Sequence, residues 1–253
     1  MVFKKMMRRG LKILAWIGIA LWFVVILGFV SGEAEEVLCN RIEVLISDTL
    51  HNRFVTESDI RDLFRSGSME LQGYPISEIN IREMEGVLEE NAYIKDAEVS
   101  TDITGRMEVR IEQRVPLVRI MPRGSGGYYL DTEGEKMPLS EQFTPHIMLL
   151  SGYISGKDAE EEQLEEMYRF CSYVEDHPFW SDQIVQIYMN RKGECELIPR
   201  VGAHQILLGS MEMWEKKLKN LEMLYEQGFP SYGWNSYEII NLKYTNQVIC
   251  TKR

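Results

Sequence analysis

The longest apolar stretch of the chain lies close to its start. Residues 13–30 (ILAWIGIALWFVVILGFV) contain no charged side chain, and a helix of this sequence would be apolar on every face. A stretch of about 18 such residues is long enough to cross a bilayer core of roughly 30 Å. The pattern therefore predicts a transmembrane helix over residues 13–30, preceded by a short tail of residues 1–12.

Charged residues on the two sides of this stretch predict its orientation. Five basic residues precede it, namely Lys4, Lys5, Arg8, Arg9 and Lys12, whereas the charges that follow it are acidic and begin with Glu33. Basic flanking residues stay in the cytoplasm, so the tail is predicted to be cytoplasmic and the chain after Ser31 to lie outside. A cleaved signal peptide is the alternative, but its apolar region usually spans about 7–15 residues and ends at a small-x-small site. The longer and bulkier stretch here favours an uncleaved anchor.

The next pattern, over residues 39–113, combines strand-like and helix-like periods. Residues 39–46 alternate between polar and apolar side chains as a strand does. Residues 93–101 and 107–112 alternate in the same way on either side of a turn at 102–105. Two amphipathic helical segments lie between these strands, and the resulting order predicts a small βααββ domain in which two helices cover one face of a sheet.

Both helical segments carry clear start signals. Thr56 followed by Asp59, and Asn80 followed by Glu83, have the spacing of a capping box. The first of these helices is predicted to end at Gly67.

Residues 116–253 have a different pattern, made mostly of short strands between Gly and Pro turns. The predicted strands are 117–121, 128–130, 147–150, 184–189, 195–198, 205–208, 237–244 and 247–251. Two helices interrupt them, over 158–176 and 210–227, and the second is predicted to stop at Gly228 with Pro230 beyond it. The pattern predicts a β-rich second domain with two or more helices, so the fold class is α+β.

The charge of the chain narrows its range of partners. The formal net charge is −11, and residues 1–32 hold five of the 28 basic residues and none of the 39 acidic ones. The remainder therefore carries a formal charge of −16. Phosphate binding needs a positive surface, so this balance argues against a nucleic-acid partner and against flat adsorption onto anionic lipid.

No residue pattern indicates a catalytic or metal-binding site. The four histidines, His51, His146, His177 and His204, are scattered and show no close ligand spacing. The glycine-rich segment 123–127 lacks the lysine and the spacing of a phosphate-binding loop, and the acidic residues at 160–166 suit the first turns of a helix. The sequence thus predicts a protein that is not an enzyme and has no catalytic residue, no metal and no cofactor.

The cysteines leave two alternatives open. Cys39, Cys171, Cys195 and Cys250 form no C-x-x-C pair, so zinc and thioredoxin-type chemistry have no support. A location outside the cytoplasm permits disulfides, and Cys195 and Cys250 both lie in predicted strands. A bond between these two is one alternative, and free cysteines that serve as small core residues are the other.

Four short phrases behind the predicted anchor match patterns of a known family. Residues 93–99 (YIKDAEV) resemble its strand pattern V-x-x-A-x-V, and residues 112–120 (EQRVPLVRI) resemble its pattern E-R-x-P-x-A-R. Residues 128–134 (YYLDTEG) resemble a y-x-v-D-x-x-G turn, and residues 240–244 (INLKY) resemble v-D-L-R-y with Asn and Lys in place of Asp and Arg. Together, and in this order, the phrases resemble the FtsQ/DivIB family of bacterial cell-division proteins.

The resemblance implies a single-pass protein of the inner (cytoplasmic) membrane, with most of its chain in the periplasm and a place at the division septum. It implies that residues 39–113 form a POTRA-like (polypeptide transport-associated) domain and residues 116–253 the family's β-rich domain. It marks Arg114, Pro116 and Arg119 as junction residues. The residue before Pro116 is held extended, so one strand can run almost directly into the next and form a stiff joint. Continuation of a single domain across this point is the alternative.

The resemblance also places a partner-binding site at the end of the chain. In the family the last strand is an exposed edge, which binds the small bitopic partner FtsB, together with FtsL, by strand addition. The corresponding residues here are Tyr244, Gln247, Val248, Ile249, Cys250, Thr251 and Lys252. A last strand that is fully paired on both sides is the alternative.

The function implied by the resemblance is a non-enzymatic divisome scaffold. It would hold FtsB- and FtsL-like partners at the septum and help to control septal peptidoglycan synthesis. A POTRA-bearing transport or membrane-assembly component is an alternative that would share the first domain. A membrane-anchored cell-wall hydrolase is another, and it would need a nucleophile or a metal constellation that the sequence does not provide.

Overall fold

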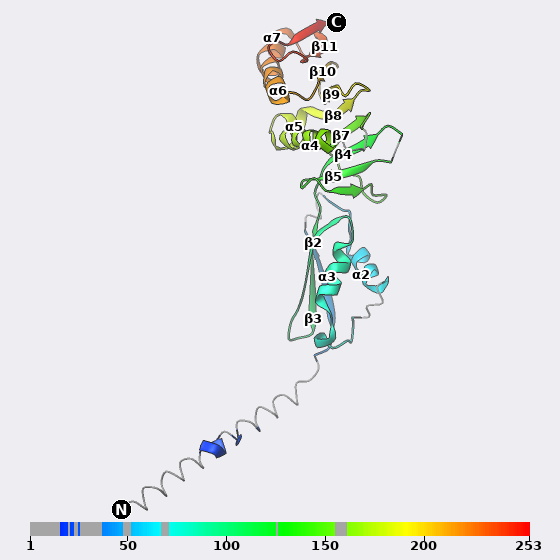
Figure 1. Ribbon diagram of the computed structural model, residues 1–253, viewed down its shortest axis with the longest axis vertical. Coiled ribbons are helices and arrows are strands. Elements are labelled where there is room, and N and C mark those ends of the chain that lie inside the picture. Colours follow the sequence, from blue (N-terminus) through cyan, green and yellow to red (C-terminus); the bar gives the residue numbers. More distant parts are fainter. Residues whose placement is uncertain are drawn as a thin grey trace, which may run out of the picture.

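The computed structural model describes residues 16–19, 21, 22, 25, 37–47, 52–66, 71–124, 126–154 and 161–253 (Figure 1). Most of the predicted transmembrane helix at 13–30, and all of the tail at 1–12, lie outside the described residues. The described positions between 16 and 25 are helical. Within the part of the chain that the structure describes, no helix is long and apolar enough to span a membrane.

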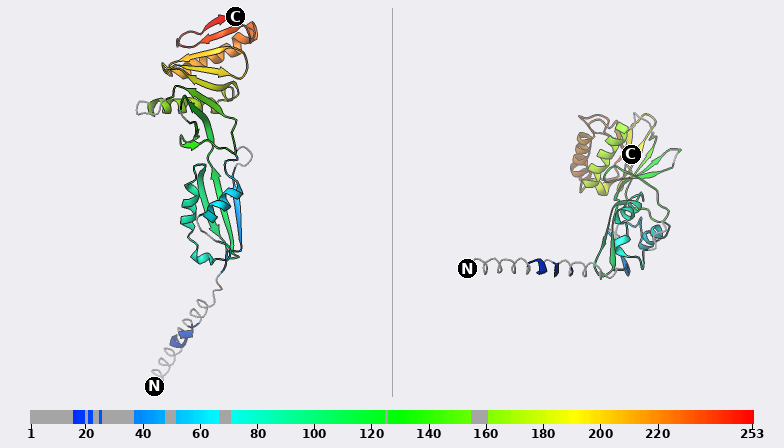
Figure 2. Two further views of the ribbon diagram at one scale, coloured as in Figure 1. Left: turned by 90° about the vertical axis from the view of Figure 1, so that its right-hand side faces the viewer. Right: turned by 60° about the horizontal axis from the view of Figure 1, so that its bottom comes forward.

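Two sheets follow one another along the long axis of the molecule, as Figure 1 and Figure 2 show. The first has three strands in the order β1-β3-β2, and the second has nine in the order β12-β11-β10-β9-β8-β7-β4-β5-β6. The observed architecture is therefore α+β, as predicted, with a small mixed domain followed by a β-rich one.

The first domain has the predicted order of elements. These elements are β1 (Arg41–Ile46), α2 (Glu57–Ser66), α3 (Ile81–Glu89), β2 (Ile94–Thr101) and β3 (Arg106–Gln113), with a short 3-10 helix at Ile76–Glu78 before α3. The central strand β3 is parallel to β1 and antiparallel to β2. Ile60 on α2, Met84 on α3 and Val109 on β3 are buried together, so both helices pack on the same sheet.

Side-chain caps explain where the two helices begin. Thr56 Oγ1 accepts a hydrogen bond from Asp59 N (3.3 Å), and Asp59 Oδ2 accepts one from Thr56 N (2.8 Å), which is the reciprocal pair of a capping box. At the start of α3, Asn80 Oδ1 accepts a hydrogen bond from Glu83 N (3.4 Å). Both predicted helix starts are confirmed, while the predicted end at Gly67 lies outside the described residues.

The second domain holds the remaining strands. They are β4 (Pro116–Pro122), β5 (Tyr128–Asp131), β6 (Lys136–Pro138), β7 (Met148–Gly152), β8 (Ile184–Met189), β9 (Cys195–Pro199), β10 (Gln205–Gly209), β11 (Tyr237–Asn241) and β12 (Ile249–Lys252). Its helices are α4 (Glu161–Asp176), α5 (Trp180–Gln183), α6 (Trp214–Met223) and α7 (Phe229–Tyr232).

The helices of the second domain lie on one side of its sheet (Figure 1). Phe170 on α4 and Leu218 on α6 are fully buried against strand residues such as Leu197. Successive side chains of a strand point to opposite faces, so the neighbours of these buried residues point away from the helices. On β9 the side chain of Leu197 is buried, and that of the next residue, Ile198, is 37% exposed. The second face of the sheet therefore stays partly open.

One helix continues beyond its predicted end. After α6 the chain passes through a π-helical segment at Leu224–Gly228 directly into α7. Gly228 has a helical φ of −81°, and Pro230 lies in the first turn of α7. The prediction that the helix stops at Gly228 is therefore wrong.

The structure also decides between the two alternatives for the cysteines, because all four are free. Cys195 lies on β9 and Cys250 on β12, with β10 and β11 between them. Three strand spacings amount to about 14 Å, whereas a disulfide needs Cα atoms about 4.4–6.8 Å apart. The Cys195–Cys250 pair cannot form in this fold.

Candidate partner-binding edge and interdomain joint

The nine-stranded sheet ends in two strands of very different character. At one end, β6 is three residues long and stops at Pro138, and its Met137 is buried in the core of the first domain. At the other end, β12 pairs with β11 alone. One side of β12 therefore presents backbone N–H and C=O groups that no strand of the described chain pairs.

The strand is shorter than its sequence predicts. β11 ends at Asn241 and β12 begins at Ile249, so Tyr244, Gln247 and Val248 lie in the loop before the strand. Lys243 N donates a hydrogen bond to Asn241 Oδ1 (2.9 Å), which turns the chain out of β11 at the end of that strand.

The side chains along this segment alternate in burial. Val248 and Cys250 are half-buried and pack against the main core of the second domain. Ile249, which is 42% exposed, and Thr251 point to the opposite, open face. Tyr244, Gln247 and Lys252 are also exposed. The strand thus offers a free backbone edge together with an apolar side chain and a basic one.

Contacts at both ends hold the strand in place. In the loop before it, Asn220 Nδ2 donates to Thr245 O (3.1 Å) and Lys243 Nζ donates to Glu194 Oε1 (2.8 Å). After it, Arg253 Nη2 donates to Ala203 O (2.7 Å). An edge that is already ordered loses less conformational entropy when a partner binds.

The electrostatics of this region do not favour covalent chemistry. Burial raises the pKa of the Cys250 thiol, and burial raises the pKa of Cys195 to about 12, so both thiols stay protonated and weakly nucleophilic near neutral pH. The Lys243 ammonium lowers the pKa of Glu194, which keeps that carboxylate charged. The segment is suited to recognition through hydrogen bonds and packing.

Of the predicted junction residues, Arg114 lies between β3 and β4, and Pro116 and Arg119 lie on β4 of the second sheet. Arg114 Nη1 forms an ion pair with Asp131 Oδ2 (2.9 Å), and the Asp131 side chain is only 2% exposed. Pro116 opens β4 and pairs in register with Asp131 on β5. The guanidinium of Arg119 lies over the ring of Tyr129, 5.9 Å from its centroid. Only Arg114 and Val115 separate β3 from β4, which is the short connection that the sequence predicts.

An aromatic cluster completes this joint, and sequence analysis did not identify it. The ring of Phe54 stacks on Tyr93 (centroids 5.2 Å apart) and meets Tyr129 (5.7 Å) and Phe143 (5.0 Å) edge to face. Phe54 and Tyr93 come from the first domain, and Tyr129 and Phe143 come from the second. The four residues are far apart in the chain, so no local pattern could have grouped them.

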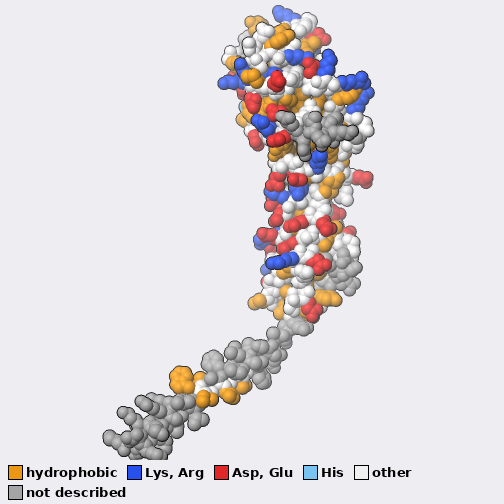
Figure 3. Space-filling view, viewed as in Figure 1, with side chains coloured by type: hydrophobic (Ala, Val, Ile, Leu, Met, Phe, Trp, Pro, Cys, Tyr) orange, Lys and Arg blue, Asp and Glu red, His pale blue; other side chains and the backbone are white. Residues whose placement is uncertain are grey.

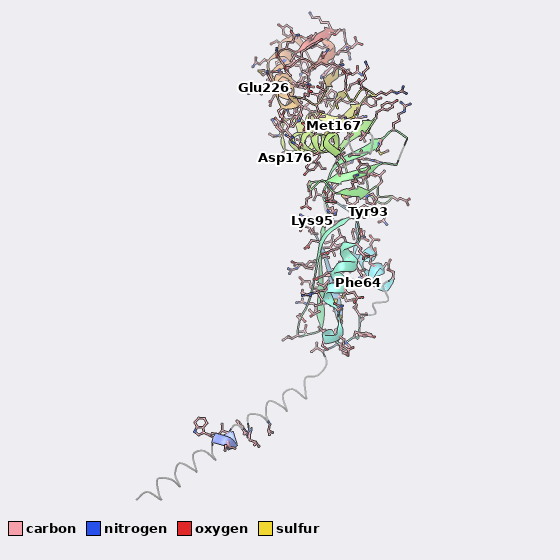
Figure 4. All side chains as sticks on the ribbon, in the orientation of Figure 1. Phe64, Tyr93, Lys95, Met167, Asp176 and Glu226 are labelled. Carbon is pink, nitrogen blue, oxygen red and sulfur yellow. The ribbon has the colours of Figure 1, made fainter. Side chains whose placement is uncertain are left out.

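Polar contacts add to the cluster. Tyr93 Oη donates to Leu139 O (3.2 Å), and Lys95 Nζ forms an ion pair with Glu133 Oε1 (2.9 Å). Figure 4 places Tyr93 and Lys95 at the junction of the domains. Within the first domain, the buried Gln113 amide accepts hydrogen bonds from Phe54 N (3.1 Å) and Val55 N (3.0 Å), which positions the aromatic ring of Phe54.

The histidines remain apart from one another. His146 is exposed, His177 follows α4, and His204 is buried with Nε2 2.8 Å from Tyr225 Oη. His51 lies outside the described residues. Among the residues that the structure describes, no group of three or more His, Cys, Asp or Glu side chains could hold a metal ion.

Comparison with known proteins links this architecture to a family. A family model for POTRA-like domains matches residues 37–112, and a family model described as FtsQ/DivIB, C-terminal related, matches residues 115–251. The curated cell division protein FtsQ of Rhodothermus marinus is 27% identical over 167 residues, which cover 62% of this chain and 60% of that protein. The match therefore spans three fifths of the relative's length. Because the FtsQ/DivIB model covers more than half of the residues, this chain belongs to the FtsQ/DivIB family.

Proposed function

We propose that this protein is a non-enzymatic scaffold of the bacterial cell-division machinery, anchored in the cytoplasmic membrane with both domains outside the cytoplasm. In this proposal β12 binds small single-span partners of the FtsB and FtsL type at the division septum, and the complex helps to control septal peptidoglycan synthesis. The observation that carries the proposal is the open edge at β12 in a chain of the FtsQ/DivIB family.

The chemistry of the edge supports strand addition. A partner strand would form main-chain hydrogen bonds with the free side of β12, and alternate side chains would supply specificity. Ile249 provides an exposed apolar contact, and Lys252 provides a positive charge for an acidic residue of the partner. The opposite edge strand, β6, is three residues long, stops at Pro138 and has Met137 buried in the core of the first domain, so it offers less edge for strand addition than β12.

The exposed side chains of the first described residues support the membrane anchor. Trp16, Ile17 and Leu21 are in helical conformation and are 70%, 54% and 65% exposed. Large apolar side chains in this number are costly in water and favourable in lipid. They belong to the charge-free stretch at residues 13–30, which basic residues precede.

Capture of partners from membranes tests the proposal. The full chain would be tagged, extracted in mild detergent and used as bait, and the bound proteins would be identified by mass spectrometry. We expect intact bait to retain small single-span proteins with coiled-coil sequences. A chain truncated after Asn246, and a folded variant with Ile249→Lys and Thr251→Lys, are expected to lose them.

Leu45→Lys is the matched control, because Leu45 is 49% exposed and lies on β1, an edge strand of the other sheet. It should retain the partners. Loss of partners with this control and retention with the β12 variants would move the site to the first domain. Failure of intact bait to retain any cell-division protein would count against the function itself.

A further inference from the structure

The end of the first domain that lies next to the predicted anchor displays several apolar side chains. Ile103 is 93% exposed, Tyr74 is 53%, Leu38 is 42% and Val37 is 38%. In Figure 3, orange side chains mark this end of the domain, beside the grey segment that leads to the N-terminus. We call these four residues the apolar base.

Backbone hydrogen bonds join the three segments from which the apolar base is built. Cys39 N donates to Tyr74 O (2.8 Å), and Ile76 N donates to Val37 O (2.9 Å). Asn40 N donates to Gly105 O (2.8 Å) in the β2–β3 turn that carries Ile103. The four residues therefore lie on segments that the fold holds together at this end of the domain.

The turn that carries Ile103 is rigid. Asp102 Oδ1 accepts hydrogen bonds from Thr104 N (2.8 Å), Thr104 Oγ1 (2.5 Å) and Arg106 N (3.1 Å). The hydrogen bond from Thr104 Oγ1 has the largest effect, followed by those from the two backbone N–H groups, and together they lower the pKa of Asp102 to about 2. Gly105 has a φ of +89°, and a Cβ at this position would collide with the Leu38 carbonyl oxygen. Turns of this kind favour small polar residues, and here the turn holds the apolar side chain of Ile103 out from the domain.

Among the described residues beside the apolar base, Arg41 and Arg106 form ion pairs with acidic side chains. Arg41 Nε lies 3.0 Å from Glu43 Oε1, and Arg106 lies 3.2 Å from Asp102 Oδ2 and 3.7 Å from Glu43 Oε2. Paired charges cost less than single ones when a surface approaches a medium of low dielectric constant. These ion pairs therefore lower the cost of bringing Arg41 and Arg106 close to lipid.

The position of the base in the chain identifies the surface that covers it. The charge-free stretch ends at Val30, and the base begins seven residues later at Val37. Seven residues span at most about 25 Å when fully extended, so an anchor at residues 13–30 keeps the base near the bilayer surface. Exposed aliphatic side chains together with a tyrosine are typical of residues at the boundary between headgroups and acyl chains.

We propose that the apolar base inserts into the outer surface of the membrane, so that the first domain stands on the bilayer and holds the molecule at a defined angle to it. This inference rests on the proposed membrane anchor. The ligand is the zwitterionic lipid interface, bound through apolar contact. Because the part of the chain after the anchor is strongly acidic, the contact is expected to need neither anionic lipid nor low salt.

Site-directed spin labelling of the full chain in phosphatidylcholine vesicles tests the proposal. Cys39, Cys171 and Cys195 are buried, so a Cys250→Ser background leaves few competing thiols. Nitroxide labels would be placed at Ile103→Cys in the base, at Gly18→Cys in the charge-free stretch, and at Tyr232→Cys, which is 68% exposed on α7. The measurement is the ratio of collision rates with oxygen and with a water-soluble nickel chelate.

We expect a several-fold higher ratio at Ile103→Cys than at Tyr232→Cys, with the highest ratio at Gly18→Cys. Equal ratios at positions 103 and 232, with position 18 in lipid, would overturn the inference and leave the anchor intact. Water accessibility at all three positions would overturn the anchor as well. A contact at position 103 that appears only after addition of phosphatidylglycerol, and disappears in high salt, would be electrostatic and would also overturn the inference.

A substitution in the base supplies a second test. With a label at Tyr74→Cys, we expect Ile103→Asp to lower the oxygen-to-nickel ratio to that of an exposed site, because a charge in the interface is costly. Leu45→Asp is the matched control, since Leu45 lies toward the far end of β1 from the base and is also exposed. An unchanged ratio with Ile103→Asp would show that Ile103 does not hold the base in the membrane.

Discussion

Asp131 lies between the two domains with its carboxylate almost completely removed from water. Arg114 supplies its charged partner, and Asp131 Oδ1 accepts hydrogen bonds from Glu133 N (2.9 Å) and Glu135 N (2.8 Å). A buried carboxylate needs such partners because its desolvation is costly. The same side chain therefore shapes the β5–β6 turn and holds the residue that follows β3.

Replacement of Arg114 by alanine is expected to lower the free energy of unfolding by about 3 kcal/mol, because it leaves the buried carboxylate without its counter-charge. Urea unfolding followed by circular dichroism measures the change. Arg65→Ala is the control, since Arg65 pairs with Asp62 (3.2 Å) on the exposed side of α2 and should contribute little. Equal changes in the free energy of unfolding for the two substitutions would show that the buried Arg114–Asp131 pair stabilises the fold no more than an exposed pair does.

His204 predicts a dependence of stability on pH. It is 4% exposed, and burial, followed by the positive charge of Arg253, lowers its pKa. The unfolded chain, with a histidine pKa of about 6.5, then binds a proton more readily than the folded chain does. Neutral His204 therefore contributes to the free energy of unfolding above about pH 6.5. This contribution is lost as the pH falls through the lower pKa that His204 has in the folded chain.

Urea midpoints measured between neutral and mildly acidic pH check this expectation. His204→Gln should remove part of the loss of stability on acidification, whereas His146→Gln, at an exposed position, should follow the parent chain. Parallel pH profiles for the parent chain and His204→Gln would contradict the assignment.

At the scale of elements, local signals place the two helices of the first domain well. The capping box of α2 and the cap of α3 were both predicted, because a cap needs only residues three positions apart and its hydrogen bonds are formed within one turn. The strands were also placed by their alternation, although their ends moved by a few residues. A side chain–backbone hydrogen bond, such as the one that Lys243 N donates to Asn241 Oδ1, can end a strand without disturbing its pattern of alternation.

Thr56→Ala is expected to lower the free energy of unfolding by about 1 kcal/mol, because it removes the acceptor for the Asp59 N–H and the partner of the Asp59 carboxylate. Thr56→Ser keeps the hydroxyl and should stay close to the parent. Denaturant midpoints of the two variants compare them directly. A loss of equal size in both would point to the methyl group rather than to the cap.

For the whole molecule, the joint determines how far the two domains act together. Tyr129 and Met137 belong to the second sheet, yet both are fully buried in the core of the first domain. With the Arg114–Asp131 and Lys95–Glu133 pairs, this shared core makes a stiff connection, and we expect a single cooperative unfolding transition.

Tyr129→Ala is expected to lower the free energy of unfolding by about 3–5 kcal/mol, because it removes the largest side chain that the two domains share. We also expect it to separate the single calorimetric unfolding transition into two. Tyr129→Phe is the control. The Tyr129 hydroxyl has no hydrogen-bond partner among the described residues, so its removal should keep one transition at nearly the parent temperature. One transition in Tyr129→Ala would show that other contacts couple the domains.

The order of strands and helices in the first domain, the starts of its two helices and the acidic character of the chain could be predicted from the sequence, because each depends on residues that are close together or on composition alone. The edge position of β12, the aromatic cluster around Phe54 and the separation of Cys195 from Cys250 depend on pairings between distant segments. The path of the chain through Gly228 depends on packing against the sheet. Local periodicity carries no information about which strands become neighbours, so these features appear only when the chain is folded.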